Sequence, residues 1–142
     1  LAARAPTVAR KHVRIDNRVA EGAAFLGEPF LLVQAIGNLL DNALDFTPAH
    51  GTVAIEAVPV GDTWQLTVTN SGSAIPDYAR ERLFERFYSL PRPDTGRKST
   101  GLGLAFVWEV AQLHGGTVTV DNVLDAAGTV SGVAARLTLP AA

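Results

Sequence analysis

Two stretches of alternating apolar and polar residues, 51–60 and 63–70, are separated only by Gly61 and Asp62. Alternation at every second position is typical of half-buried strands, and a two-residue connection joins antiparallel strands in a tight hairpin. The pattern therefore predicts a β-hairpin in the middle of the chain. A second hairpin is expected near the end, with its strands over 118–123 and 130–139.

Three further segments show helical patterns, and two show weak strand patterns. Helices are expected over 28–45, 76–87 and 101–113, and strands over 12–19 and 23–26. Three helices and five or six strands, mostly in antiparallel hairpins, indicate an α/β protein in which helices are layered on one face of a mixed sheet.

The composition limits the function classes. The chain has 142 residues, of which 47% are hydrophobic, so one domain with a sizeable core is expected. The net charge of −2 argues against a non-specific nucleic-acid binder, and the absence of cysteine excludes thiolate chemistry. Residues 1–11 are interpreted as a linker remnant and 12–142 as the domain. Because the chain begins at Leu1 and contains no methionine, we expect it to be a piece of a longer protein.

The first predicted helix carries a polar stripe formed by Gln34, Asn38, Asp41, Asn42 and Asp45. One interpretation is an outer face in contact with solvent. However, asparagine is a poor helix former, and a solvated face is better served by Glu, Lys or Arg. Two asparagines at positions i and i+4 place two amide oxygens close together, which suits a hard cation such as Mg²⁺. A site for metal and phosphate is therefore the second interpretation.

Two glycine-bearing segments follow. Gly72 lies just after a predicted strand, where it permits close approach of a flat ligand or simply forms a turn. Gly101 and Gly103 open a helix, whose free N–H groups favour anions. The segment 77–98 holds six basic and four acidic residues, a net charge of +2, and is either a solvated charged loop or a lid over phosphates.

Taken in order, these segments resemble the motifs of sensor histidine kinases. The N box is resembled by NLLDNALDFT (38–47), the G1 box by NSGSAIP (70–76), and the F box by FERFY (84–88). The G2 box is resembled by GLGL (101–104), and the closing glycine elements by HGGT (114–117) with Gly128-Thr129. Their order and spacing fit across 12–140.

The resemblance implies the Bergerat fold, a two-layer α/β sandwich whose mixed, mostly antiparallel sheet is covered on one face by three helices. It implies the ATP-binding catalytic domain of a two-component sensor histidine kinase, which binds Mg-ATP and donates the γ-phosphoryl group to a histidine on a separate dimerisation domain. That domain and, indirectly, a response regulator are the implied partners. The fragment is expected to be monomeric, inactive alone, and cytoplasmic within a bacterial inner-membrane sensor.

The resemblance also implies roles for single residues. Asn42 would ligate Mg²⁺, and Asn38 would contact the phosphate–metal cluster. The backbone of Gly101, Leu102, Gly103 and Leu104 would hold the phosphates, and the lid candidates for the γ-phosphate are Arg86 and Lys98. Around the adenine, the implied contacts are Phe46, Asn70, Gly72 and Ile75, with Thr129 acting through a water. The three histidines, His12, His50 and His114, are interpreted as structural or surface residues.

Four positions depart from the family pattern. Asn70 stands where an aspartate usually accepts a hydrogen bond from adenine, Asp45 where a basic residue is common, and Ala74 and Ser99 where glycines are usual. A charged hydrogen bond contributes about 1.5–3 kcal/mol and a neutral one about 1, so weaker ATP binding is expected. Because an amide also donates, relaxed discrimination against guanine is a further hypothesis.

Two alternative functions remain, and Asn38 argues against a third. A regulatory nucleotide-binding module without phosphotransfer is favoured by Asn70, Ala74 and Ser99. An anti-sigma-factor serine kinase has the same fold. An ATPase of the gyrase or MutL type needs a glutamate one turn before the metal-binding asparagine, where this chain has Asn38.

Overall fold

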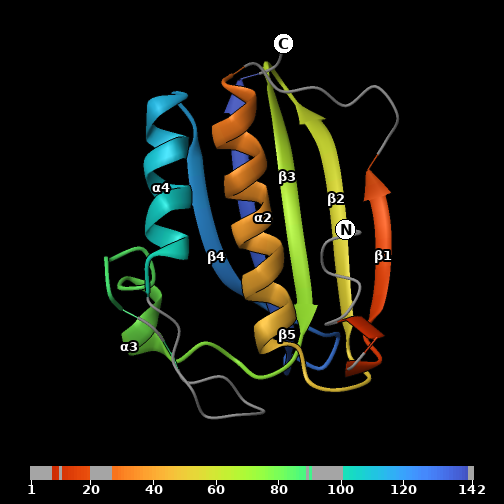
Figure 1. Ribbon diagram of the computed structural model, residues 1–142. Helices are drawn as coiled ribbons and strands as arrows, with labels where there is room; N and C mark the ends of the chain where they lie inside the picture. The colour runs from red at the N-terminus through yellow and green to blue at the C-terminus, as the bar shows by residue number, and fades with distance from the viewer. Residues whose placement is uncertain (1–7, 10, 20–26, 89, 91–100, 141–142) are drawn as a thin grey trace.

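The computed structural model describes residues 8–9, 11–19, 27–88, 90 and 101–140. A five-stranded sheet forms one layer, and helices cover one of its faces (Figure 1). The elements in chain order are β1 (Arg14–Val19), α2 (Pro29–Phe46), β2 (Thr52–Val60), β3 (Thr63–Ser71), α3 (Asp77–Arg80), α4 (Gly103–Leu113), β4 (Thr117–Leu124) and β5 (Val130–Pro140). The two-layer α/β sandwich expected from the sequence is confirmed. The strand expected over 23–26 and most of the charged loop lie outside the described residues.

The sheet has the strand order β1-β2-β3-β5-β4. Both predicted hairpins are present, β2 with β3 and β4 with β5, and β1 pairs in parallel with β2. The alternation seen in the sequence places Val53 and Val68 on the covered face, where both are almost fully buried. The centre of the sheet is formed by the antiparallel pairing of β3 with β5, which are far apart in the sequence.

Helices α2 and α4 lie side by side across the sheet, with α3 beyond the start of α4 (Figure 1). Their apolar residues, such as Leu39 and Val107, join Leu137 of the sheet in one buried core. Burial of these apolar side chains is the main force that holds the two layers together.

The helix expected over 76–87 is corrected to the four residues of α3. Beyond it the chain runs in turns to Phe87, which has a positive φ of 68° and donates its N–H to the Gly101 carbonyl oxygen (3.0 Å). A left-handed residue does not fit inside a right-handed helix, so no helix continues through Phe87. Gly101 itself has a φ of 75°, and α4 accordingly begins two residues later than expected.

Both ends of α2 are held by side chains. At the N-terminus, the Glu28 carboxylate accepts a hydrogen bond from the Leu31 N–H (2.7 Å), and the Glu28 N–H donates to His114 Nε2 (3.0 Å). At the C-terminus, Lys11 Nζ donates to the carbonyl oxygens of Leu44 (2.9 Å) and Thr47 (2.9 Å). Lys11 is only 7% exposed, so the segment interpreted as a linker packs into the domain at this residue. A cation at this end also interacts favourably with the helix dipole.

Within the described residues, no helix combines the length and the apolar character needed to cross a bilayer.

Candidate functional site

A pocket of about 380 Å³ lies between α2, the loop after β3 and the start of α4. This volume falls in the usual range for small-molecule sites, about 300–1,000 Å³. The residues that line it are Asn38, Asp41, Asn42, Asp45, Phe46, Asn70, Ser73, Ala74, Ile75, Pro76, Tyr78, Leu83, Tyr88, Leu90, Gly101, Gly103, Leu104, Val120 and Val133. Most of the residues expected from the sequence therefore meet at one site.

The polar stripe of α2 forms one wall of this pocket. Asn38, Asp41, Asn42 and Asp45 all line it, so the stripe faces the pocket and is not simply an outer face. Asn38 accepts a hydrogen bond from Gln34 Nε2 (3.1 Å) and donates through Nδ2 to the Gly103 carbonyl oxygen (3.2 Å). Asn38 thus links α2 to the start of α4.

The side-chain oxygen atoms on this wall are suitable ligands for a hard cation. They are amide and carboxylate oxygens, the ligand type that Mg²⁺ prefers. Among the described residues, no group of three or more His, Asp or Glu side chains is placed to hold a metal. A cation bound here therefore needs further ligands from water and from phosphate oxygens, which is the usual way in which Mg²⁺ is held with nucleotides.

The inner end of the pocket is mostly apolar and contains one buried amide. Asn70 is 6% exposed, and its Nδ2 donates to the Ser71 carbonyl oxygen (3.1 Å). This contact leaves Oδ1 as the acceptor available to a ligand. Phe46, Ile75 and Val133 supply apolar surface around it. The combination suits a flat heterocycle with one hydrogen-bond donor.

Gly72 shapes this end of the pocket, although it is outside the lining. Its φ is 142°, a conformation that favours glycine, and an added Cβ would lie 3.2 Å from the Phe46 carbonyl oxygen. The glycine therefore allows the loop after β3 to pass close to the end of α2.

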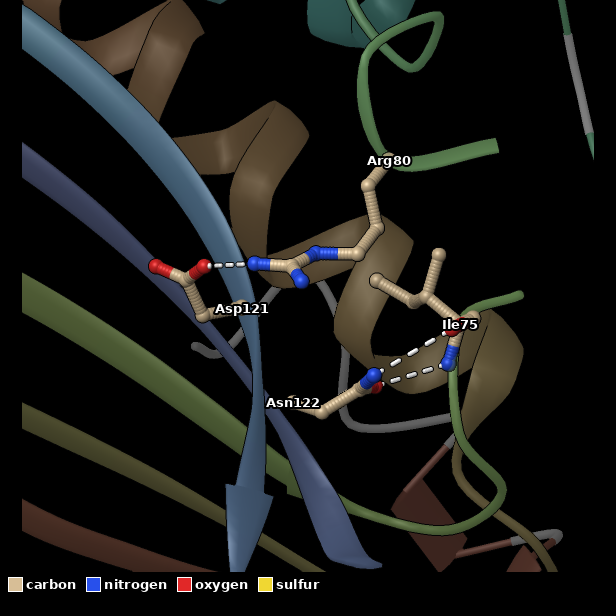
Figure 2. Close-up of polar contacts among 4 residues, drawn as sticks. All are labelled: Ile75, Arg80, Asp121 and Asn122. Carbon is tan, nitrogen blue, oxygen red and sulfur yellow. Dashed lines mark hydrogen bonds and ion pairs between the residues drawn. The ribbon is translucent and has the colours of Figure 1, made fainter. Parts of the chain in front are cut away.

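The loop that carries Ile75 into the pocket is held by strand β4, as Figure 2 shows. Asn122 Oδ1 accepts from the Ile75 N–H (2.8 Å), and Asn122 Nδ2 donates to the Ile75 carbonyl oxygen (3.2 Å). The neighbouring Asp121 forms an ion pair with Arg80 of α3 (2.5 Å). Sequence reasoning missed these contacts, and no local pattern around Asn122 could have indicated its partner.

The start of α4 approaches the F-box segment closely. An added Cβ on Gly101 would lie 2.5 Å from the Phe87 carbonyl carbon, so a glycine is needed here for packing as well as for its positive φ. Leu102 precedes α4 without a side-chain cap. No side chain therefore caps the first N–H groups of this helix. The first two residues of the helix, Gly103 and Leu104, line the pocket.

Several expected site residues are placed elsewhere. Arg86 forms an ion pair with Glu109 of α4, and the hydrogen bond that its guanidinium donates to the Glu109 carboxylate raises the pKa of Arg86 above its ordinary value. Thr129 is exposed in the turn before β5, where its N–H donates to Asp125 Oδ1 (3.0 Å), and it is outside the pocket lining. The β5 residue that reaches the pocket is Val133. Leu102 is exposed outside the lining, and Lys98 lies outside the described residues.

Taken together, the sheet, the covering helices and this pocket define a nucleotide-binding α/β sandwich. Residues 27–142 match the family described as histidine kinase-, DNA gyrase B- and HSP90-like ATPase, and the chain belongs to this family. The resemblance to sensor histidine kinases drawn from the motif order is confirmed.

Curated relatives of the chain are sensor proteins. The chain is 59% identical over 96 residues to sensor protein CreC of Escherichia coli K12, a match that covers 68% of this chain and 20% of that protein. It is 38% identical over 96 residues to sensor protein IrlS of Burkholderia pseudomallei, covering 67% of this chain and 21% of that protein. The sequences of residues 84–93 and 98–116 are likewise similar to those of CreC-type kinases. The chain spans about a fifth of the length of these relatives.

Solved structures agree with this assignment. The mycobacterial sensor histidine kinase MprB superimposes with a TM-score of 0.79 at 28% identity, covering 99% of this chain and 90% of that one. The catalytic domain of histidine kinase ThkA superimposes with a TM-score of 0.83 at 22% identity, covering 99% and 88%, and supports the fold.

Proposed function

We propose that this domain binds Mg-ATP in the pocket and donates the γ-phosphoryl group to a histidine on a separate dimerisation domain. The observation that carries the proposal is that two groups of different chemistry line one pocket. The amide and carboxylate stripe of α2 and the uncapped start of α4 line the same pocket, and Asn38 joins them through its hydrogen bond to the Gly103 carbonyl oxygen (3.2 Å). One group suits a metal ion and the other suits phosphate oxygens, so a nucleoside triphosphate with its cation satisfies both.

The base would occupy the apolar inner end. Phe46 and Ile75 offer flat and aliphatic surface, and Asn70 Oδ1 would accept a hydrogen bond from the adenine amino group. The amide acceptor is neutral, so it contributes less than a carboxylate at the same position.

The phosphates would lie between Asn42 and the start of α4. Asn42 would hold Mg²⁺, which when bound neutralises phosphate charge during transfer, and Asn38 would contact the phosphate–metal cluster. The backbone N–H groups near Gly103 would donate to phosphate oxygens. Arg86 is held by Glu109, so its action at the γ-phosphate would need that ion pair to open.

The chain's own groups would position the nucleotide, and the nucleophile would come from outside. Position 38 holds an asparagine, which does not act as a general base, so slow hydrolysis of ATP is proposed. The proposed partners are the phosphoacceptor domain and, through it, a response regulator. The proposed location is the cytoplasmic side of a membrane-anchored sensor, with this domain as a monomeric unit.

Calorimetric titration with ATP, with and without Mg²⁺, tests the nucleotide site. Asn42→Ala is expected to lose the gain in affinity that Mg²⁺ gives to the wild type, a change of about tenfold. Asn17→Ala is the matched control, because Asn17 lies exposed on β1, away from the pocket. A wild-type protein that binds no ATP up to millimolar concentration would contradict the proposal.

Addition of a dimerisation domain with its histidine tests the transfer step. Labelled phosphate should appear on that domain and be lost in acid, as expected for phosphohistidine. Acid-stable label would favour the serine kinase. Tight ATP binding without any label would favour the regulatory module, for which Asn70 and Ala74 are the structural argument.

A further inference from the structure

The side chain of Asn122 pairs with both backbone polar groups of Ile75. It lies on β4, which is an edge strand of the sheet. Its Oδ1 accepts from the Ile75 N–H (2.8 Å), and its Nδ2 donates to the Ile75 carbonyl oxygen (3.2 Å), as Figure 2 shows. A side-chain amide carries one acceptor and one donor group, like the peptide unit of a neighbouring strand. Asn122 thus holds the loop at the sheet edge without a further strand.

This contact is the principal restraint on the part of the loop that lines the pocket. Before it, the Gly72 N–H donates to the Ser131 carbonyl oxygen (3.3 Å), and after it the Ala79 N–H donates to the Pro76 carbonyl oxygen (2.9 Å). Within the described residues, no other hydrogen bond is made by positions 73–75. The place of Ile75 in the pocket therefore depends on Asn122.

The same strand also contributes to the pocket directly. Val120 lines the pocket and precedes Asn122 by two residues, so the two side chains leave the same face of β4. Ile75 lines the pocket from the loop above. One face of β4 thus contributes Val120 to the pocket lining directly, and through Asn122 it also holds Ile75 in place.

We propose that Asn122 is a positioning residue that sets Ile75 against the nucleobase and so determines the affinity for adenine nucleotides. This inference rests on the proposed function. It concerns the base end of the pocket, whereas Asn42 concerns the metal end. The two residues are therefore expected to differ in how their effects depend on Mg²⁺.

The test compares Asn122→Ala and Asn122→Asp with the wild type by ATP titration, with and without Mg²⁺. The alanine variant removes both hydrogen bonds. The aspartate variant has nearly the same shape and keeps an acceptor for the Ile75 N–H, but it places an oxygen against the Ile75 carbonyl oxygen. Both should weaken ATP binding about five- to tenfold, as expected for the loss of one or two net hydrogen bonds. The loss should be the same with and without Mg²⁺.

Asp121→Ala is the matched control. Asp121 adjoins Asn122 on the same strand and contacts α3 through Arg80, and both partners of that ion pair are about half exposed. ATP affinity in this variant should stay within about twofold of the wild type, because exposed ion pairs contribute little. Hydrogen exchange of the Ile75 amide, measured by NMR, should accelerate in Asn122→Ala and not in Asp121→Ala.

Three results would overturn the inference. The first is unchanged ATP affinity in Asn122→Ala with faster exchange at Ile75. The second is a loss of affinity that appears only with Mg²⁺, and the third is normal binding by Asn122→Asp if the alanine variant does not fold. Failure of the proposed function can be distinguished from failure of this inference. In the first case the wild type itself does not bind ATP, which also excludes the positioning role; in the second the wild type binds ATP and the Asn122 variants do not behave as expected.

Discussion

The two walls of the pocket are built in different ways. The wall formed by α2 presents Asn38, Asn42 and Phe46 from one helix of 18 residues, whose periodicity and caps are encoded locally. The opposite wall is assembled from the loop after β3 and the start of α4. Its pieces are held by contacts between residues far apart in sequence, Ile75 with Asn122 and Phe87 with Gly101.

A sequence motif can therefore identify the residue types of a site without determining where those residues lie in the structure. On the helix wall, spacing alone determines which side chains share a face. On the loop wall, the residue types suggest a ligand, but their places depend on partners that local spacing does not reveal. The helix wall should therefore tolerate changes elsewhere in the chain better than the loop wall, with one exception at Lys11.

Lys11→Met tests whether the helix wall is self-supporting. The ammonium group donates to three carbonyl oxygens at the end of α2, those of Leu44, Asp45 and Thr47. Loss of these charged hydrogen bonds at a buried position should lower the free energy of unfolding by about 3 kcal/mol. Urea unfolding measures this. Lys11→Arg, which keeps the charge, should lose less.

Arg14→Met is the surface control, because Arg14 is exposed on β1. It should change the free energy of unfolding by no more than about 0.5 kcal/mol. An equally small effect of Lys11→Met would show that the end of α2 is stabilised by its own sequence, and the contrast between the walls would become sharper.

Gly101→Ala and Gly103→Ala form a matched pair on the loop wall. An alanine at 101 would combine a positive φ with a Cβ 2.5 Å from the Phe87 backbone, whereas an added Cβ at 103 meets nothing within 4 Å. The first change should cost about 2 kcal/mol through strain. The second should be neutral or stabilising by about 0.5–1 kcal/mol, because Gly103 is helical.

The readouts of this pair separate packing from ligand contact. Only Gly101→Ala should lower the free energy of unfolding measured in urea and accelerate exchange of the Phe87 amide. ATP affinity should fall in Gly103→Ala as well, because Gly103 lines the pocket where phosphates would lie. Equal stability of the two variants would show that the close approach of Gly101 to Phe87 does not hold the loop wall.

The sequence allowed the helix wall to be predicted more fully than the loop wall. The bounds of α2 and the hairpin of β2 with β3 followed from periodicity, a proline near the helix start and a two-residue turn. Periodicity also placed the polar stripe on one face of α2, but it left open whether that face meets solvent or a ligand. The burial of Lys11 did not follow, because it depends on carbonyl groups more than 30 positions away. The predicted length of α3 was wrong: the helix ends at Arg80 and the chain runs on in turns to Phe87, which contacts Gly101 14 positions later in the sequence.

Most residues of the candidate site were predicted from the sequence, but some of the predicted residues lie outside the pocket. Asn38, Asn42, Asn70 and Ile75 meet in one pocket as expected. Thr129 does not, because the turn before β5 ends at that residue and the pairing of β5 with β3 brings Val133 opposite Asn70. Such strand register is set by long-range pairing, and motif spacing does not determine it.

Asn70→Asp tests the buried amide that β3 contributes to the inner end of the pocket. A carboxylate should raise ATP affinity several-fold, since a charged acceptor contributes about 1 kcal/mol more than a neutral one. The free domain should become less stable, because position 70 is 6% exposed and a carboxylate there loses its hydration. ATP titration and urea unfolding should therefore move in opposite directions. Asn17→Asp, which adds the same charge on exposed β1, should change neither by much.

The base preference of the wild type follows from the same contact. Since Asn70 Nδ2 donates to the Ser71 carbonyl oxygen, Oδ1 is left to meet the base. An acceptor favours adenine, whose amino group donates, over guanine, whose O6 accepts, contrary to the relaxed discrimination expected from residue type alone. Competition of GTP with ATP measures this preference. Equal affinity for the two nucleotides would mean that the amide turns to suit either base, and that the contact with Ser71 does not fix it.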